Sequence, residues 1–268
     1  MNVLKHLKKI NKVHGWGRAG YWYLVCSFGL NYLFNRPSLA KLTYRNRYQQ
    51  EKKLFYTVTT GDYDQLNEIP VMLPNWDFVC FTDNPELKSN SWQIKVFEND
   101  HDLDPIRLSR HLKINNHLID NDYDLSIYVD GNIKIRGDLD SFLAQALPFD
   151  KQFAVLLHPF HTSLLEEVEL CVTTGKDHEN VLWEQYHYYV DNERFCDPFP
   201  HINARMLIRR TNDGDTRQLM EIWFAQLMQW SRRDQVGFNY SLSKCPNLAP
   251  HYIPYWIFRS YFKKLDHC

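Results

Sequence analysis

Short runs rich in β-branched and aromatic residues recur between residues 54 and 160, separated by turn or helical segments. Such runs are typical of buried strands, and their alternation with helices predicts an α/β sheet whose strands are mostly parallel. Ligands of these sheets bind beyond the carboxyl ends of the strands, so the residues that follow each run are candidates for a site. The predicted strands are 54–60, 77–83, 92–97, 125–129 and 153–157, with a helix at 106–119 between the third and the fourth.

The chain of 268 residues has the length of one large domain. No repeat and no linker rich in Pro, Gly or Ser divides it, and helical patterns dominate from residue 164 onward. We therefore expect one α/β domain over residues 54–250, its central sheet flanked by helices. A helical extension over residues 1–53 precedes this domain, and a C-terminal tail over residues 251–268 follows it.

The N-terminal extension is basic, whereas the rest of the chain is acidic. Residues 1–53 hold eleven Lys and Arg and one acidic residue, and residues 54–268 hold 20 basic and 31 acidic residues. The extension is also partly apolar, but its apolar stretch at residues 21–34 is shorter than the roughly 20 residues of a spanning helix. Two interpretations stay open: docking on an anionic membrane surface, or a helical hairpin that packs on the domain. Nucleic acid is not an expected partner.

Six cysteines without a Cys-x-x-Cys pair indicate free, mostly buried thiols. They predict a reducing, cytoplasmic location, peripheral to the inner face of the membrane if the extension docks there. The sequence has neither the Gly-rich phosphate loop of dinucleotide-binding folds nor a P-loop, and no nucleophile elbow or H-E-x-x-H pair. The lack of either phosphate loop disfavours Rossmann dehydrogenases and P-loop kinases.

The apolar strand at 125–129 runs directly into Asp130, Gly131 and Asn132. Two oxygen-bearing side chains at the end of a buried strand can hold a divalent cation that is bound to a diphosphate. The same tripeptide is a favoured hairpin turn, and on local evidence alone the turn is the better interpretation.

The helix before this strand favours the metal and diphosphate site over the turn, because it carries Arg107, Arg110 and Lys113 at intervals of three residues. This spacing places the cations along one helical face, where they could neutralise phosphate groups beside a metal. A solvated helix face is the alternative interpretation of the same spacing.

A further polar cluster follows the strand at 153–157 and contains His158, His161, Glu166 and Glu167. These side chains could bind a metal, supply a general base or lie on the acceptor side of a site. The two glutamates are equally explained by the preference of acidic residues for the first turn of a helix. Farther along the chain, Asp234 precedes an apolar helical segment and could be its N-cap.

Eight motifs, taken in order, make the sequence resemble the glycosyltransferase-like family of plant mucilage and turgor proteins, which has bacterial members. The resemblance covers residues 54–240, and a looser one links the same order to the glycogenin-type (family 8) transferases. Both imply a GT-A fold with a nucleotide-binding α/β half. The motifs are YTVTTGDYD at 56–64, FVCFTDN at 78–84, SRHLKI at 109–114, SIYVDGN at 126–132, HP at 158–159, EE at 166–167, IRR at 208–210 and RDQ at 233–235.

The resemblance also implies roles for single residues. Asp234 and Gln235 would be the catalytic pair, which favours retention of configuration. Asp234 would bind the hydroxyls of the donor sugar or stabilise the developing oxocarbenium ion. A Mn²⁺ or Mg²⁺ ion would be held by Asp130, Asn132 and His251. Within the nucleotide site, the diphosphate would be contacted by Arg110 and Lys113. The full set that binds the nucleotide sugar would be Thr57, Thr59, Tyr63, Asp83, Arg110, Lys113, Asp130 and Asn203.

The expected function is transfer of a sugar from a nucleotide-sugar donor, with UDP-sugars favoured, to a glycan or a lipid-linked saccharide. Asn132 replaces the second carboxylate of the D-x-D motif, and Arg205 stands where the glycogenin type has a glycine. Two alternatives therefore stay open. The protein could be a lipid or phosphoester hydrolase, or a non-catalytic module that binds nucleotide sugars.

Overall fold

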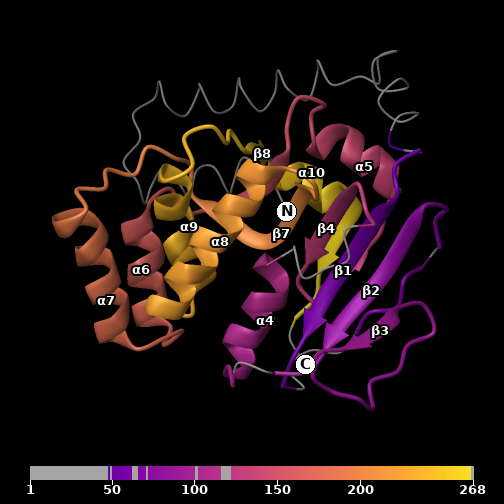
Figure 1. Ribbon diagram of the computed structural model, residues 1–268, viewed down its shortest axis with the longest axis horizontal. Coiled ribbons are helices and arrows are strands. Elements are labelled where there is room, and N and C mark those ends of the chain that lie inside the picture. Colours follow the sequence, from indigo (N-terminus) through magenta and orange to yellow (C-terminus); the bar gives the residue numbers. More distant parts are fainter. Residues whose placement is uncertain are drawn as a thin grey trace, which may run out of the picture. The chain divides into compact units, whose positions relative to one another are not determined.

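The computed structural model describes residues 48, 50–61, 66–70, 72–99, 102–115 and 122–266. These residues fall within one unit, Arg45–Cys268. Its centre is a seven-stranded sheet with the order β3-β2-β1-β4-β7-β6-β8, seen obliquely in Figure 1. The strands are β1 (Lys53–Thr59), β2 (Trp76–Thr82), β3 (Gln93–Val96), β4 (Leu125–Val129), β6 (Phe153–Leu157), β7 (Ile202–Arg210) and β8 (His251–Ile253).

Six of these seven strands run in one direction, and β7 runs against them. Every residue of β1 and of β4 is buried, as expected for central strands covered on both faces. The predicted α/β fold with a mostly parallel sheet flanked by helices is therefore confirmed.

Helices cover both faces of the sheet through two separate apolar clusters. One cluster joins the sheet to α5 (Leu139–Ala146) and α10 (Tyr255–Tyr261). The other joins it to α4 (Pro105–Ile114), α8 (Gly214–Gln229) and α9 (Asp234–Ser243). In Figure 1, α6 (Leu164–Thr173) and α7 (Glu179–His187) lie at the opposite end of the view from β1–β3. The π-helix η2 (Tyr188–Asn192) continues α7.

The helix starts follow from local sequence. Asp104, Asp138, Ser163 and Asp213 each accept a hydrogen bond from a backbone amide in the first turn of α4, α5, α6 and α8, respectively. Asp234 was the predicted N-cap of α9, but Arg233 occupies the cap position and Asp234 is the first helical residue. The predicted helix 106–119 is seen as α4 up to residue 114, and residues 116–120 lie outside the described part of the chain.

Both predicted domain boundaries differ from the structure. Residues 251–264 are part of the fold, because β8 pairs with β6 and β9 (Phe262–Lys264) pairs with β5 (Ile133–Ile135). At the other end, Tyr48 is 1% exposed and donates a hydrogen bond to the Leu147 carbonyl, and Lys53 already belongs to β1. The rest of the predicted extension, residues 1–47 and 49, lies outside the described residues.

The described thiols behave as buried, free cysteines. Cys80, Cys171 and Cys245 are buried and unpaired within the described chain, and Cys196 is exposed. Burial raises the pKa of Cys80 and of Cys171 to about 11 in each case, so both stay protonated at neutral pH. They are therefore unsuited to act as nucleophiles.

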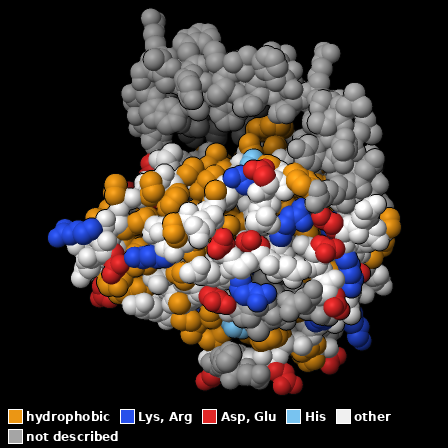
Figure 2. Space-filling view, turned by 45° about the horizontal axis from the view of Figure 1, so that its top comes forward, with side chains coloured by type: hydrophobic (Ala, Val, Ile, Leu, Met, Phe, Trp, Pro, Cys, Tyr) orange, Lys and Arg blue, Asp and Glu red, His pale blue; other side chains and the backbone are white. Residues whose placement is uncertain are grey.

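The surface of the domain carries both signs of charge. On the described part of the face drawn in Figure 2, acidic and basic side chains are interspersed among apolar ones. No helix in the described residues has both the length and the apolar character needed to cross a bilayer.

Candidate functional site

The polar ends of three strands meet at one edge of the sheet. Because β7 runs against β4 and β6, its amino end lies beside the carboxyl ends of both. The backbone amide of Asp130 donates to the Arg205 carbonyl at 3.0 Å, and that of His158 donates to the His201 carbonyl at 2.9 Å. The residues predicted at the ends of two separate strands are thereby brought to the same edge of the sheet, on either side of β7.

Asp130 follows β4 directly, as the sequence predicted. Its side chain is 37% exposed, and Oδ1 lies 3.9 Å from the Lys113 Nζ. The Tyr128 hydroxyl donates to Oδ1 at 2.9 Å. Burial, together with the charge of Asp130, raises the pKa of Tyr128 well above its usual value, so this hydroxyl remains a proton donor. Tyr128 was not predicted, although its spacing of two places it on the same side of the strand as Asp130.

The cationic face of α4 is buried against a carboxylate. Asp234 is 3% exposed, and its Oδ2 lies 2.5 Å from the Lys113 Nζ and 3.2 Å from the Arg110 Nε. Burial alone would raise the pKa of Asp234, but Arg110 and Lys113 outweigh it and hold that pKa well below its usual range. The solvated-face interpretation is therefore wrong for Lys113, which is 1% exposed.

The third cation of the predicted face has a different function. Arg107 bonds its own N-cap residue, Asp104, and donates to the carbonyls of Leu227 and Trp230. These contacts attach the start of α4 to the end of α8. Arg107 is thus a structural residue, whereas Arg110 and Lys113 point to the site.

A buried arginine fixes the other end of α4. Arg209 of β7 is fully buried and donates to the carbonyls of Ile114 and Lys113 at 2.8 Å each. It also donates to the Tyr56 hydroxyl, which in turn donates to the Lys113 carbonyl. Cationic side chains commonly satisfy the last carbonyls of a helix in this way. No local pattern predicts this role, because Arg209 is far from α4 along the chain.

Several of the residues predicted to line the nucleotide lie within β1 or at the ends of β1 and β2. Thr57 is 1% and Thr59 is 8% exposed, and both lie within β1. The Thr57 hydroxyl has no hydrogen-bond partner among the described residues, and the Thr59 hydroxyl contacts the Cys80 thiol at 3.5 Å. Both carboxylate oxygens of Asp83 share the hydrogen bond that the Gly61 amide donates, which connects the ends of β1 and β2. Tyr63 lies outside the described residues.

The three predicted metal ligands do not all come together. Asn132 is 4% exposed and donates its side-chain amide to the Leu265 carbonyl at 3.1 Å, so its amide nitrogen anchors the C-terminal segment. His251 pairs with Ala154 on β6, three strands from β4 and thus about 14 Å across the sheet from it. The expectation that His251 shares a cation with Asp130 is therefore wrong, because one ion cannot span that distance.

Asn203 and Gln235 lie close to the cluster that Arg110, Lys113, Asp130 and Asp234 form, which we call the charged cluster. The Asn203 Oδ1 accepts hydrogen bonds from the backbone amide of Arg205 at 3.2 Å and from its Nε at 2.7 Å. Asn203 therefore orients Arg205, whose guanidinium carbon is 5.9 Å from the centre of the Tyr255 ring. Gln235 is half-buried and donates its backbone amide to the Asp234 Oδ1 at 3.1 Å.

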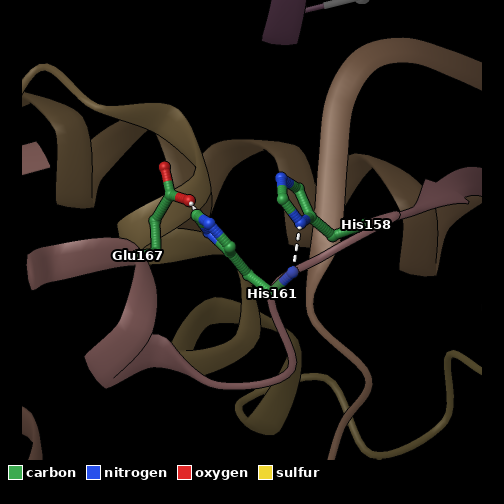
Figure 3. A group of neighbouring side chains, drawn as sticks. All are labelled: His158, His161 and Glu167. Carbon is green, nitrogen blue, oxygen red and sulfur yellow. Dashed lines mark hydrogen bonds and ion pairs between the residues drawn. The ribbon is translucent and has the colours of Figure 1, made fainter. Parts of the chain in front are cut away.

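Imidazole side chains lie near Glu167, one of the two glutamates in the polar cluster predicted after residues 153–157 (Figure 3). The His161 Nδ1 lies 2.9 Å from the Glu167 Oε2, and the His201 Nε2 lies 3.5 Å from the same oxygen. Burial alone would raise the pKa of Glu167, but His201 and His161 outweigh it and lower that pKa below its usual value. Glu166 accepts from the backbone and hydroxyl of Thr162, beside the start of α6.

The sequence predicted His158, His161 and Glu167 but not His201, which the reversed direction of β7 places beside them. The rings of His158 and His161 have centroids 4.2 Å apart. Burial first, and then the neighbouring His161 and His201, lower the pKa of His158 to about 3, so this imidazole is neutral at physiological pH. The edge of the sheet therefore presents a cluster of Arg, Lys and Asp side chains at Asp130 and a cluster of imidazoles around Glu167.

A family model described as TOD1/MUCI70, glycosyltransferase-like domain, matches residues 82–262 of the chain. Among solved structures, the chain is similar to the apo structure of the WbbM bifunctional glycosyltransferase, with 10% sequence identity and a TM-score of 0.41. That alignment covers 75% of this chain and only 38% of the other. The search of curated proteins found no match.

Proposed function

The chain belongs to the TOD1/MUCI70 family of glycosyltransferase-like domains, and from this premise we propose that it transfers a sugar from a nucleotide-sugar donor. A UDP-sugar is the favoured donor, and a glycan or lipid-linked saccharide is the favoured acceptor. The observation that supports the proposal is the cluster of Arg110, Lys113 and Asp234 beside the half-exposed Asp130. It places cations next to a carboxylate at the ligand-binding edge of an α/β sheet.

Charge is the central difficulty of this reaction, because a nucleoside diphosphate leaves with additional negative charge. Within the cluster, Asp130 and Asp234 balance the charges of Arg110 and Lys113. An incoming diphosphate therefore adds negative charge that the side chains alone do not offset. Arg110, whose side chain is 20% exposed, is the cation best placed to meet it, while the fully buried Lys113 fixes the position of Asp234.

The remaining charge fits a divalent cation, Mn²⁺ or Mg²⁺, on Asp130. Such ions are often held by one or two carboxylates together with the phosphates of the substrate, which matches the single exposed carboxylate here. The Asn132 side chain is the second candidate ligand through its oxygen. When bound, the metal would supply positive charge that stabilises the departing diphosphate.

We assign Asp234 and Gln235 to the donor side. Two cations hold Asp234, so it acts by fixing Arg110 and Lys113 rather than as a nucleophile. Gln235, one residue further into α9, is the side chain that would bind a hydroxyl of the donor sugar. Retention of configuration stays a prediction of the resemblance, and the roles of Thr57, Thr59, Tyr63, Asp83 and Asn203 toward the nucleotide stay predictions as well.

A panel of nucleotide sugars, screened by thermal shift with and without Mn²⁺, tests the proposal. A donor at 100 times its Kd stabilises the folded state by about 2.7 kcal/mol, which raises Tm measurably. We expect a UDP-sugar to raise Tm in the presence of Mn²⁺ and to release UDP when an acceptor is added. An Arg110→Met variant should lose the shift, and an Asp191→Ala variant, which alters an exposed carboxylate on η2, should keep it. If no nucleotide sugar shifts Tm of the wild type, the proposed function is wrong.

The alternative of a lipid or phosphoester hydrolase is favoured by one observation, the His161–Glu167 pair, which could activate water. A hydrolase of this kind needs no nucleotide. Release of product from a lipid or phosphoester substrate, without any nucleotide sugar, would support this alternative. The non-catalytic alternative predicts the thermal shift without turnover.

We also propose that the basic extension holds the protein at an anionic membrane surface on the cytoplasmic side. Each Lys or Arg near such a surface contributes about 1 kcal/mol, and salt screens the attraction. A full-length variant with Lys5, Lys8, Lys9 and Lys12 changed to Gln should therefore sediment poorly with anionic liposomes at low salt, while the wild type sediments well. If the wild type ignores anionic vesicles, the extension does not dock there, and the packed-hairpin interpretation is favoured.

A further inference from the structure

The hydrogen bond between His161 and Glu167 fixes which nitrogen of His161 carries its proton (Figure 3). Glu167 is buried and its pKa is lowered, so its carboxylate is ionised and can only accept. The Nδ1 of His161 must therefore be the donor across the distance of 2.9 Å. In the neutral ring, Nε2 then holds a lone pair and can accept a proton.

His158 has the opposite arrangement. Its Nδ1 accepts hydrogen bonds from the backbone amides of His161 at 2.7 Å and Phe160 at 3.3 Å. A backbone amide can only donate, so this nitrogen carries the lone pair and the proton sits on Nε2. Since the pKa of His158 is lowered to about 3, the ring keeps this single proton at neutral pH. His158 thus offers a donor beside the acceptor that His161 offers.

The same side chains could be taken for a metal site, because ligand atoms of His158, His161 and Glu167 lie within 4.8 Å of one another. The hydrogen bonds of His158 argue against a metal. Coordination through its Nε2, while Nδ1 accepts from the two amides, would require lone pairs on both nitrogens and hence an anionic ring. His158 and His161 together fit a ligand that both donates and accepts a hydrogen bond better than they fit a metal.

A hydroxyl group is such a ligand, because it has one proton and two lone pairs. It could donate to the His161 Nε2 and accept from the His158 Nε2–H, across rings whose centroids are 4.2 Å apart. The side chain of His161 is 18% exposed, so the pair can be reached from outside. Hydroxyl groups are the reacting groups of saccharide acceptors.

The position of the pair relative to Asp130 suits an acceptor. His158 follows β6 and Asp130 follows β4, and β7 lies between them, which separates the two strand ends by about 10 Å. A sugar attached to a diphosphate at Asp130 would fill this gap. Arg233 acts electrostatically on both carboxylates and lowers the pKa of Asp234 and of Glu167.

We propose that His158 and His161 bind the reacting hydroxyl of the acceptor, and that His161, oriented by Glu167, is the base that takes its proton. This inference rests on the proposed function. The acceptor oxygen forms a bond to the anomeric carbon, and the bond from that carbon to the diphosphate oxygen breaks. The diphosphate leaves with the electron pair of that bond, and the hydroxyl proton moves to the His161 Nε2, where Glu167 stabilises the resulting imidazolium. A base on the acceptor side gives inversion, in competition with the retention that the resemblance implies.

His161→Gln and Glu167→Gln variants test this role, with His187→Gln as a matched control. His187 pairs with Asp191 at the same distance of 2.9 Å, but on an exposed surface with both side chains more than 60% exposed. We expect His161→Gln to lower kcat about 100-fold or more and Glu167→Gln to lower it about 10-fold, while the control is unchanged. The Tm shift that the donor causes should be the same in all three variants, because the donor site is intact.

Two further measurements separate a catalytic role from a structural one. Imidazole added to a His161→Gly variant should restore part of kcat, and product NMR should show an inverted anomeric centre. If the donor shifts Tm but His161→Gln keeps wild-type kcat, or if the product retains its configuration, the base role is wrong and the proposed function stands. If no donor shifts Tm, the proposed function itself fails.

Discussion

The clusters around Asp234 and Glu167 are each built on one buried carboxylate near the start of a helix, but different partners hold the two carboxylates. Asp234 is held by Arg110, which is a permanent cation, and by Lys113, whose pKa burial lowers but whose charge the paired carboxylate favours. Glu167 is held by His161 and His201, whose rings can be neutral or charged. The first arrangement keeps a fixed charge in place and suits an anionic ligand. The second can pass a proton and suits a hydroxyl group.

The largest expected effect comes from a substitution that breaks the charged cluster. Lys113→Met removes one of the two cations that pair with the buried Asp234 and leaves Arg110. Loss of one partner from a buried ion pair typically lowers the free energy of unfolding by about 3–5 kcal/mol. Urea denaturation should show a midpoint well below that of the wild type. The double variant Lys113→Met, Asp234→Leu should recover most of the stability, because it removes both charges. A single variant as stable as the wild type would contradict this account.

The second prediction separates stability from function at Asp130. Asp130→Ala should lower kcat by about 100- to 1,000-fold, or about 3–4 kcal/mol, because a half-exposed carboxylate at the site is lost. Its free energy of unfolding should change by less than about 1 kcal/mol, since Lys113 keeps Asp234 as its partner. Steady-state kinetics at saturating donor and urea denaturation measure the two effects. Near-wild-type turnover would show that Asp130 does not serve the reaction.

The smallest expected effect is a difference between the two clusters in how each contributes to the pH dependence of stability. The pKa of His158 is about 3 in the folded state and near 6.5 when the chain is unfolded, so between these values the unfolded state binds the extra proton. Stability therefore falls as pH drops from 7 to 5, by about 1 kcal/mol after allowance for the ring being only half-buried. Asp234 has a lowered pKa, so its contribution is lost only below about pH 4 and does not change in this interval.

A His158→Asn variant tests this pH dependence, because an amide oxygen can still accept from the turn but does not titrate. Urea denaturation of both proteins at pH 7 and pH 5 should show a smaller loss for the variant. Burial also lowers the pKa of His251. This histidine therefore adds a similar loss of stability to the wild type and to the variant. The quantity to compare is the difference between the two losses. Equal losses in the two proteins would mean that His158 is not the group responsible.

Local spacing let the sequence predict most of the charged cluster. Arg110 and Lys113 are three residues apart on one helix, and Asp130 follows an apolar strand, so periodicity alone places each on its element. The wrong prediction at His251 had a different origin. It was carried over from the resemblance to the glycogenin-type transferases, whereas in this structure β8 pairs with β6 on the far side of β7.

The sequence by itself determined the strands, the helices, the mostly parallel sheet and the membership of the family, because these depend on patterns within short segments and on ordered motifs. Only the tertiary structure decided that Lys113 is buried against Asp234, that Arg209 binds the end of α4, and that His201 joins His161 at Glu167. All three contacts join residues at least 34 positions apart, and two of them depend on the reversed direction of β7. Strand direction and register are set by the packing of the whole sheet, which no local period encodes.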